Sequence, residues 1–123
     1  MLSSCSGPYQ PQMMYLSWTR PGKSRGPHLH IHQTDMFIFP GPGLFELYLW
    51  PKDKPHERKM ISCGSDIPKL IMVWPGVVHA YKNVSQISGL VINLPDQLYK
   101  GYMKSREEDI IRFENDPNNP YTF

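Results

Sequence analysis

The stretch Gly26-Pro27-His28-Leu29-His30-Ile31-His32 places a histidine at every second position. Side chains of a β-strand alternate between its two faces, so these histidines are predicted to share one face, with Leu29 and Ile31 on the other. That face is either exposed to solvent or lines a cavity. His79 favours the cavity, because it follows the tight turn Pro75-Gly76, which sends a strand back across the sheet. Two such histidine-bearing strands are a usual way for a small barrel to build a site.

Short apolar, β-branched or aromatic runs surround these two segments. Proline (13 residues) and glycine (9 residues) punctuate the chain at short intervals, as in an all-β domain with many turns. The runs predict about eight strands, and their spacing is typical of sandwiches and barrels. They cover residues 13–19, 27–32, 35–39, 44–50, 58–62, 69–74, 77–82 and 89–94.

The two ends of the chain are expected to differ from this pattern. Residues 1–12 are predicted to form an N-terminal arm, and residues 13–123 a single domain. Ser105 and Glu108 fit a capping box, in which each side chain accepts a hydrogen bond from the other residue's backbone N–H. They predict one short C-terminal helix of about two turns. Its apolar side chains would face the barrel: Ile110, Ile111 and Phe113.

The composition excludes several classes of function. A chain of 123 residues suits one domain with a modest core. The net charge of +2, from 13 basic and 11 acidic side chains, indicates neither a nucleic-acid nor a membrane-surface partner. No run approaches the ~18 apolar residues of a bilayer span. Cys5 and Cys63 are expected to be free thiols in a reducing compartment, and with no signal segment in view they predict a cytoplasmic protein.

The two histidine segments could hold a metal ion. Imidazole nitrogens together with one carboxylate suit iron, manganese, nickel or zinc, and leave coordination positions open for a substrate. This interpretation predicts a metal-dependent oxygenase or isomerase whose cofactor is a divalent transition metal. His32 is a spare candidate. The predicted ligands are His28, His30, Asp35 and His79.

The same segments resemble the two sequence motifs of the cupin family. The first motif is matched by Gly22, His28, His30, Asp35 and a glycine between 41 and 43, and the second by Gly76, His79 and Asn83. Asp35 stands where cupins usually carry glutamate. The resemblance implies a small cupin-type β-barrel, or jelly roll, over residues 13–123. Because cupin barrels commonly pair through edge strands, it also implies a homodimer formed through the apolar N-terminal strand.

A narrower resemblance, from about Tyr15 onward, is to the dTDP-4-dehydrorhamnose 3,5-epimerases and related proteins. It rests on Arg25-Gly26-Pro27-His28, the segment Val73 to His79, and the segment Phe113 to Pro117. In that family a histidine removes the proton next to the 4-keto group of a nucleotide-linked sugar. A carboxylate orients this histidine, and a tyrosine returns a proton from the opposite face. The resemblance therefore implies an isomerase of nucleotide-linked sugars that needs no cofactor.

The resemblance also implies a role for each matching residue. His28 corresponds to the base, and His79 to a polar residue near the keto oxygen. Asp116 corresponds to the orienting carboxylate. Arg25 corresponds to a residue near the sugar or the diphosphate, where its fork of donors suits phosphate oxygens.

The proton-donating tyrosine has no counterpart at the matching position, where Ile92 stands. Tyr81, on the same predicted strand face as His79, is the candidate acid. Lys82 and Asn83 beside it are candidate substrate-binding residues. Double epimerisation, single epimerisation, ketoisomerisation, simple proton exchange and a non-catalytic sugar-binding barrel all stay open.

Overall fold

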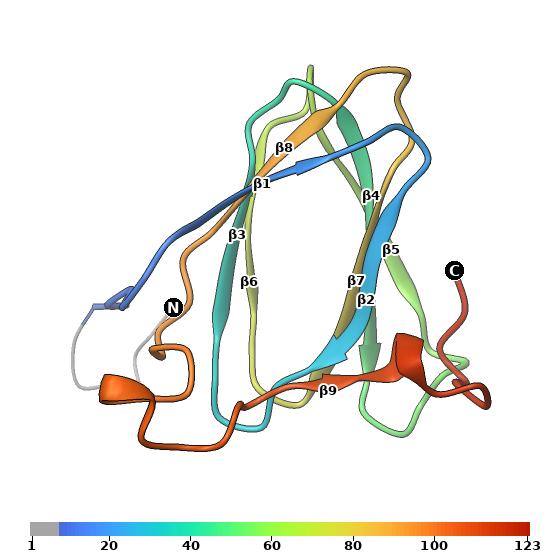
Figure 1. Ribbon diagram of the computed structural model, residues 1–123. Coiled ribbons are helices and arrows are strands. Elements are labelled where there is room, and N and C mark those ends of the chain that lie inside the picture. Colours follow the sequence, from blue (N-terminus) through green and yellow to red (C-terminus); the bar gives the residue numbers. More distant parts are fainter. Residues whose placement is uncertain (1–7) are drawn as a thin grey trace.

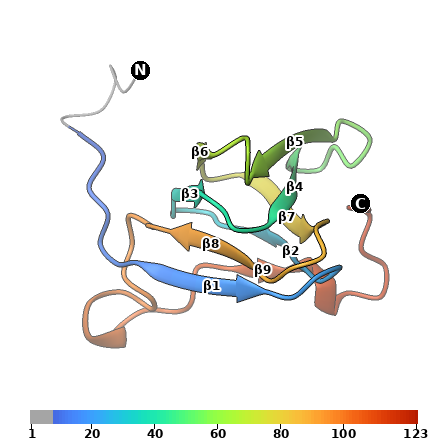
Figure 2. The ribbon, with the colours of Figure 1, turned by 90° about the horizontal axis from the view of Figure 1, so that it is seen from above.

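A computed structural model describes residues 8–123 as two antiparallel sheets packed face to face (Figure 1, Figure 2). The sheets have the strand orders β1-β8-β3-β6 and β5-β4-β7-β2-β9. No ladder joins them within residues 8–123, so the architecture is a sandwich and not a closed barrel. The first eight strands are β1 (Tyr15–Thr19), β2 (Ser24–Leu29), β3 (Asp35–Phe39), β4 (Leu44–Pro51), β5 (Lys59–Gly64), β6 (Lys69–Val73), β7 (Val77–Asn83) and β8 (Gly89–Asn93).

The eight predicted strands are confirmed, with ends that differ by up to three residues. Inward side chains of the two sheets meet in one core, because alternate residues of each strand point between the sheets. Phe37 and Phe39 of β3 face Phe45 and Leu47 of β4, and all four are buried. Burying each such side chain contributes roughly 1.5–3 kcal/mol. This core holds the strands around a cavity described below.

The segment predicted as a C-terminal helix is largely extended. Residues 105–110 have no helical turn, and the strand β9 (Ile111–Arg112) pairs with β2. Single 3-10 turns flank this stretch as η1 (Tyr102–Lys104) and η2 (Phe113–Asn115). The helix prediction was wrong because a two-turn helix is marginal alone, and pairing with β2 offers the backbone better partners. No helical segment of residues 8–123 has the length and hydropathy of a membrane span.

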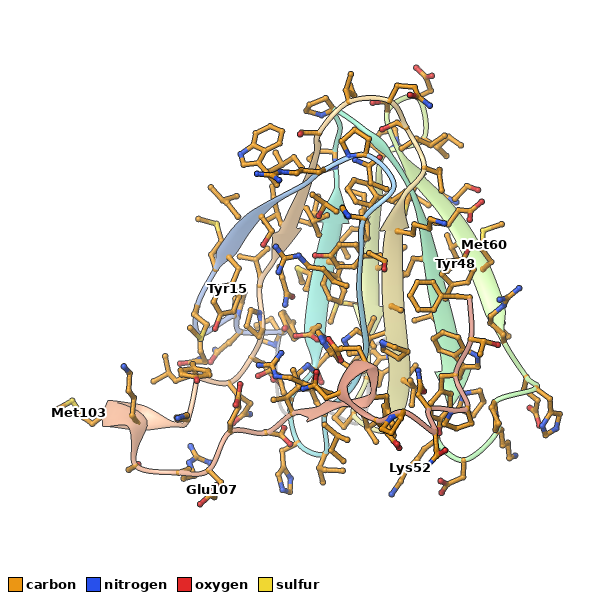
Figure 3. All side chains as sticks on the ribbon, turned by 45° about the vertical axis from the view of Figure 1, so that its right-hand side comes forward. Tyr15, Tyr48, Lys52, Met60, Met103 and Glu107 are labelled. Carbon is orange, nitrogen blue, oxygen red and sulfur yellow. The ribbon has the colours of Figure 1, made fainter. Side chains whose placement is uncertain are left out.

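The C-terminal tail covers the outer face of the five-stranded sheet. The Tyr121 ring lies 5.5 Å from the Trp50 ring and 4.8 Å from the Phe113 ring, centroid to centroid. The Phe123 ring lies 5.1 Å from Tyr48, which Figure 3 shows on the face that the tail crosses. This second apolar cluster anchors the end of the chain and fixes β9 beside β2.

The outer face of the four-stranded sheet has no such cover among residues 8–123. Its cross-strand register places Leu16 opposite Ile92, Ile92 opposite Ile38, and Ile38 opposite Leu70. Leu16 and Leu70 are 60% and 55% exposed. We call this surface the outer apolar face, and it carries no charged side chain; its members are Leu16, Trp18, Met36, Ile38, Leu70, Met72, Leu90 and Ile92.

Candidate functional site

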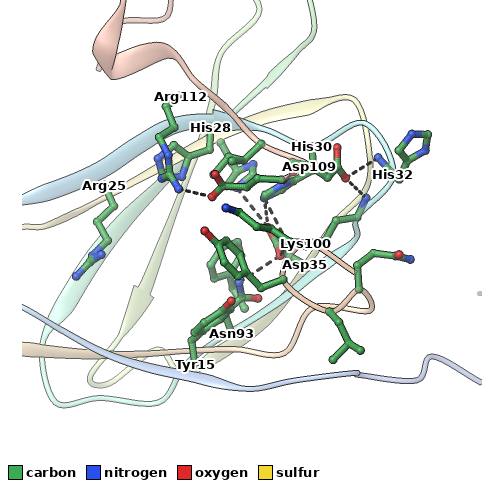
Figure 4. A pocket seen from close by; sticks show the side chains of 18 of the residues that line it. Tyr15, Arg25, His28, His30, His32, Asp35, Asn93, Lys100, Asp109 and Arg112 are labelled. Atoms are coloured by element: carbon green, nitrogen blue, oxygen red, sulfur yellow. Dashed lines mark hydrogen bonds and ion pairs between the residues drawn. The ribbon is translucent and has the colours of Figure 1, made fainter. Parts of the chain in front are cut away.

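A cavity of about 390 Å³ lies between the two sheets and beneath residues 97–112 (Figure 4). Seven of the candidate site residues that the sequence singled out line it: Arg25, His28, His30, His32, Asp35, His79 and Tyr81. Lys82, Asn83 and Asp116 are not among the residues of its wall. The sandwich therefore brings together the two histidine segments, and leaves three predicted residues outside.

His28 is held at the cavity wall by Glu114. Its Nε2 atom lies 2.7 Å from Oε2 of Glu114, because the pairing of His28 with Arg112 places η2 beside β2. Burial lowers the pKa of His28 more than Glu114 raises it, so the ring is neutral near pH 7. With Nε2–H donating to Glu114, Nδ1 keeps its lone pair. This arrangement is that of a general base.

The carboxylate beside His28 is thus Glu114, and the structure does not bring Asp116 to it. Asp116 lies beyond the η2 turn, where its Oδ1 atom accepts a hydrogen bond of 2.9 Å from the backbone N–H of Asn118. By geometry, the carboxylate placed to orient His28 is therefore Glu114 and not Asp116. The sequence offered Glu114 as a second carboxylate in the same segment, two residues before Asp116.

Asp35 and His30 form a buried ion pair. Oδ2 of Asp35 lies 3.1 Å from Nε2 of His30, and Oδ1 accepts hydrogen bonds from the amides of Gln33 and Asn93. Burial lowers the pKa of His30, but the carboxylate of Asp35 and the backbone carbonyl of Asp109 outweigh it and raise the pKa overall. At Asp35 the directions are reversed. Burial raises the pKa of its carboxyl group, but the nearby histidines and the Gln33 amide outweigh burial and lower the pKa overall. Both ring nitrogens of His30 are therefore protonated in the metal-free pair.

His79 adds a neutral imidazole to this pair. Burial lowers its pKa to about 4, and its Nδ1–H donates to the backbone carbonyl of Val77 at 3.1 Å. Its Nε2 lone pair then faces Oδ2 of Asp35 at 3.4 Å. The ligand atoms of His30, Asp35 and His79 all lie within 4.8 Å of one another. Three of the four predicted metal ligands thus converge, while His28 is engaged by Glu114.

The opposite wall of the cavity comes from the four-stranded sheet. Figure 4 shows Tyr15 and Asn93 across the cavity from His28 and Arg112. Burial raises the pKa of Tyr15, so its phenol stays protonated. Oδ1 of Asn93 is buried and has no hydrogen-bond partner within residues 8–123. Sequence reasoning missed both residues, although Tyr15 and Ser17 alternate on the inward face of the first predicted strand.

Three comparisons with known proteins bear on this fold. No protein-family model matches the chain, and no curated protein sequence does. The capsular polysaccharide assembling protein CapF from Staphylococcus aureus superposes with a TM-score of 0.73, at 15% identity over 85% of this chain and 27% of CapF. A dTDP sugar isomerase from Desulfovibrio desulfuricans G20 gives 0.70, at 18% identity over 100% of this chain and 76% of that one.

A third similar structure is QdtA, a sugar 3,4-ketoisomerase from Thermoanaerobacterium thermosaccharolyticum in complex with TDP. Its TM-score is 0.61, at 18% identity over 83% of this chain and 66% of QdtA. The chain has a cupin-type fold. The all-β cupin prediction is therefore confirmed, while the chain spans only about a quarter of CapF and two thirds of QdtA.

In this cupin-type sandwich Asn83 is a structural residue. It is fully buried, and its Nδ2 donates to the backbone carbonyls of Thr19 and Ile87, both at 2.8 Å. Its Oδ1 accepts from the backbone N–H and the hydroxyl of Ser85. These bonds use its full capacity, so no group is left for a ligand. Lys82 pairs in register with Ser24 and likewise stays outside the cavity wall.

Tyr81 lies deep in the cupin core and is only 6% exposed. Its ring packs edge-on against Phe37, Phe39 and Phe45, with centroid separations of 5.6 to 5.9 Å. Burial raises the pKa of Tyr81, which keeps its phenol neutral. Of the tyrosines in the cavity wall, Tyr81 therefore forms part of the floor, whereas Tyr15 stands opposite His28.

Asp109 ties the C-terminal segment over the cavity. Its carboxylate oxygens accept hydrogen bonds from the backbone N–H groups of Ile31, His32 and Gln33 at 2.8 to 2.9 Å. The chain bends at these residues, so β2 ends at Leu29 rather than at residue 32. His30 turns into the cavity and His32 is exposed. The expectation that all three histidines lie on one strand was therefore wrong, because β2 ends before His30, although all three line the cavity.

Proposed function

We propose that the chain is a sugar-nucleotide-modifying enzyme that removes a proton next to the keto group of a nucleotide-linked keto sugar. One observation carries this proposal: a neutral His28 held by Glu114 faces the protonated phenol of Tyr15 across the cavity. A base and an acid on opposite walls are what inversion at a carbon atom next to a ketone requires. The similar structures named as sugar isomerases support the same class of substrate.

The reaction divides between the two walls. Nδ1 of His28 takes the proton from the carbon next to the keto group, and the bonding electrons move onto the keto oxygen as an enolate. Glu114 stabilises the imidazolium so formed, as in other histidine–carboxylate pairs. Return of a proton from Tyr15 to the opposite face of that carbon inverts it and gives a 3,5-epimerase-like reaction. For a ketoisomerase, the hydroxyl proton on the deprotonated carbon moves to the enolate oxygen, and His28 returns its proton to the former keto carbon. The deprotonated carbon then becomes the new ketone and the old keto oxygen becomes a hydroxyl.

Deuterium exchange tests this proposal. The protein is incubated in heavy water with a dTDP-linked 4-keto sugar, and the product is analysed by NMR. Deuterium at an inverted carbon identifies an epimerase, and a shifted keto group identifies a ketoisomerase. Tyr15→Phe is expected to abolish inversion and keep exchange at the carbon served by His28. Absence of exchange with the wild-type protein contradicts the proposal.

A metal-dependent cupin is the second candidate function, and the convergence of His30, Asp35 and His79 favours it. The Nδ1 atom of each histidine is bound to a backbone carbonyl, of Asp109 or of Val77, so Nε2 is the atom presented to a metal. Two imidazoles and a carboxylate fit iron, manganese, nickel or zinc. When bound, such an ion supplies Lewis-acid polarisation of a substrate oxygen.

Metal analysis separates the two candidates. Elemental analysis and calorimetric titration with zinc or manganese are made on wild-type, His30→Ala and His28→Ala proteins. One equivalent of metal in the wild type and in His28→Ala, lost in His30→Ala, supports the metal-dependent function. Protein that is folded, metal-free and unable to bind either ion contradicts it.

We also propose that the chain forms a homodimer through the outer apolar face rather than through an edge strand. The tail covers the other sheet, whereas this face leaves Leu16, Trp18 and Leu70 more than half exposed. Contiguous exposed apolar patches mark interaction surfaces. A two-fold axis brings identical patches together, and an uncharged face meets its copy without like-charge repulsion.

Sedimentation equilibrium checks the homodimer. Leu16→Glu combined with Leu70→Glu is expected to convert a dimer into a monomer, because four carboxylates would face one another across the two-fold axis. Met60→Glu is the matched control, since Met60 is 48% exposed on β5 of the other sheet. A wild-type protein that is monomeric at all concentrations, or a double variant that stays dimeric, contradicts this interface.

A further inference from the structure

Residues 97–107 form a loop whose two ends are tied to the same part of the sandwich, the connection between β2 and β3. Before the loop, the carboxylate of Asp96 accepts from the Thr34 N–H at 2.8 Å, and the Asp96 N–H donates to the Thr34 carbonyl at 3.2 Å. After the loop, the carboxylate of Asp109 accepts from the backbone N–H groups of residues 31–33. A surface loop with such closely spaced ends is an Ω-loop.

The body of this loop is only lightly bound to the sheets. Residues 103–107 are exposed, and Figure 3 shows Met103 and Glu107 at its outer end. In the described part of the chain, one hydrogen bond leaves the loop, from the Tyr99 N–H to Sδ of Met13 at 3.1 Å, and the others close on the loop itself. Segments with few buried contacts open at a lower free energy than the rest of a fold.

The backbone of the loop is also strained. Lys100, Met103 and Lys104 each have a φ of 57°, in the left-handed region where the Cβ atom crowds the following carbonyl. Glycine enters this region freely, but none of these three residues is glycine. An open arrangement that relaxes them therefore loses few bonds and relieves strain.

The first part of the loop supplies a wall of the cavity. Gln97, Leu98, Tyr99 and Lys100 line it, and Figure 4 shows the Lys100 side chain in the cavity. No carboxylate of residues 8–123 lies within salt-bridge distance of the Lys100 ammonium. A bound ligand therefore meets an unpaired cation that only the closed loop provides. Contacts made in one state alone are what shifts a conformational equilibrium.

We propose that residues 97–107 are a lid, hinged at Asp96 and Asp109, that opens to admit a ligand and closes over it. The identity of the ligand, a nucleotide-linked keto sugar, rests on the function proposed above, whereas the opening is a property of the chain itself. Asp109 separates the lid from the site, because its backbone carbonyl holds Nδ1 of His30 while its carboxylate fixes the end of the lid. His30 therefore keeps its place while the lid moves.

Limited proteolysis with trypsin tests the lid, because Lys100, Lys104 and Arg106 offer cleavage sites within it. In the free wild-type protein we expect cleavage there at a rate that is nearly independent of urea below the unfolding transition, because a local opening exposes little surface. A dTDP-linked 4-keto sugar at about 100 times its Kd is expected to slow this cleavage roughly 30- to 100-fold by mass action. Cleavage at Lys52, which is exposed in the β4–β5 connection, is expected not to change.

Two lysine variants separate the closed-state contact from the opening. Lys100→Met is expected to leave the cleavage of the free protein at Arg106 unchanged and to lose about tenfold of the protection by the sugar, the contribution of one charge-assisted hydrogen bond. Lys104→Met is the matched control, because Lys104 has the same φ but is exposed and lies outside the cavity wall. Asp109→Ala frees one hinge and is expected to speed cleavage of the free protein about tenfold. Thermal melting shows that each variant is folded.

The outcomes distinguish the lid from the proposed function. Lid cleavage that rises with urea as steeply as global unfolding overturns the proposal, because the lid then does not open by itself. Sugar binding seen by calorimetry without slower cleavage in the lid also overturns it. Equal protection of Lys100→Met and Lys104→Met contradicts the contact of Lys100 with the ligand. Urea-independent lid cleavage in a protein that does not bind the sugar supports the opening and contradicts only the proposed function.

Discussion

Replacement of His28 by alanine is expected to slow deuterium exchange into a dTDP-linked 4-keto sugar by about 10²- to 10⁴-fold, the contribution of a positioned general base. His28 is the cavity histidine whose ring is neutral, reachable and oriented by a side-chain carboxylate. His79 is neutral but only 3% exposed and has no side-chain carboxylate to orient it, and His30 is protonated and paired with Asp35. Loss of the His28 ring therefore removes the base, and added imidazole is expected to restore part of the rate.

The control for this variant is His56→Ala. His56 is 80% exposed at its side chain in the β4–β5 connection and lies outside the cavity wall. Glu114→Gln is expected to have an intermediate effect and to shift the pH profile, because the hydrogen bond survives while the charge that raises the pKa of His28 is lost. Equal exchange rates in the wild type and His28→Ala contradict the assignment of the base.

Replacement of Asp35 by alanine is expected to lower the unfolding free energy by about 3 kcal/mol, the lower end of the cost of breaking a buried pair. Asp35 is 1% exposed and accepts hydrogen bonds from His30, Gln33 and Asn93. Alanine leaves these donors without an acceptor in a site that excludes most water. His30 can shed its proton, which limits the loss. Urea denaturation of EDTA-treated protein measures it.

Asp35→Asn separates charge from hydrogen bonding in this cluster. Asparagine keeps an oxygen that accepts from the Gln33 and Asn93 amides. Asp35→Asn is therefore expected to lower the unfolding free energy by about half as much as Asp35→Ala. Glu57→Ala removes an exposed carboxylate of the β4–β5 connection and is expected to change the unfolding free energy by less than about 0.5 kcal/mol. Equal stability of Asp35→Ala and Glu57→Ala contradicts the buried ion pair.

The strands were predictable because their inward residues alternate. Phe37 and Phe39, or Phe45 and Leu47, are separated by residues of the opposite face, and that pattern survives folding. The segment after residue 100 was not predictable in this way. Ser105 and Glu108 form a plausible local cap, but Asp109 binds three backbone N–H groups some 77 residues away. A local pattern cannot report contacts over that separation.

The sequence predicted the histidines and Asp35 at the centre of the site, and also Arg25 and Tyr81 in its wall. Their spacing follows from strand geometry, so the sequence was sufficient to predict that residues of β2, β3 and β7 meet in one site. The sequence could not show that Glu114, and not Asp116, contacts His28. Glu114 lies within the η2 turn, whereas Asp116 follows it. Asn83 illustrates the reverse error: it matched a motif position, yet its four hydrogen bonds belong to the β1–β2 and β7–β8 connections.

The contact between His28 and Glu114 joins residues 86 positions apart in the chain. Closing so long a segment costs conformational entropy before any contact repays it, and non-local pairing slows folding. Hairpins such as β4–β5 involve near neighbours and can form while synthesis continues. The base, in contrast, acquires its orienting carboxylate only after residue 114 has left the ribosome. Under the proposed function, the base therefore gains its orienting carboxylate later than hairpins such as β4–β5 can form.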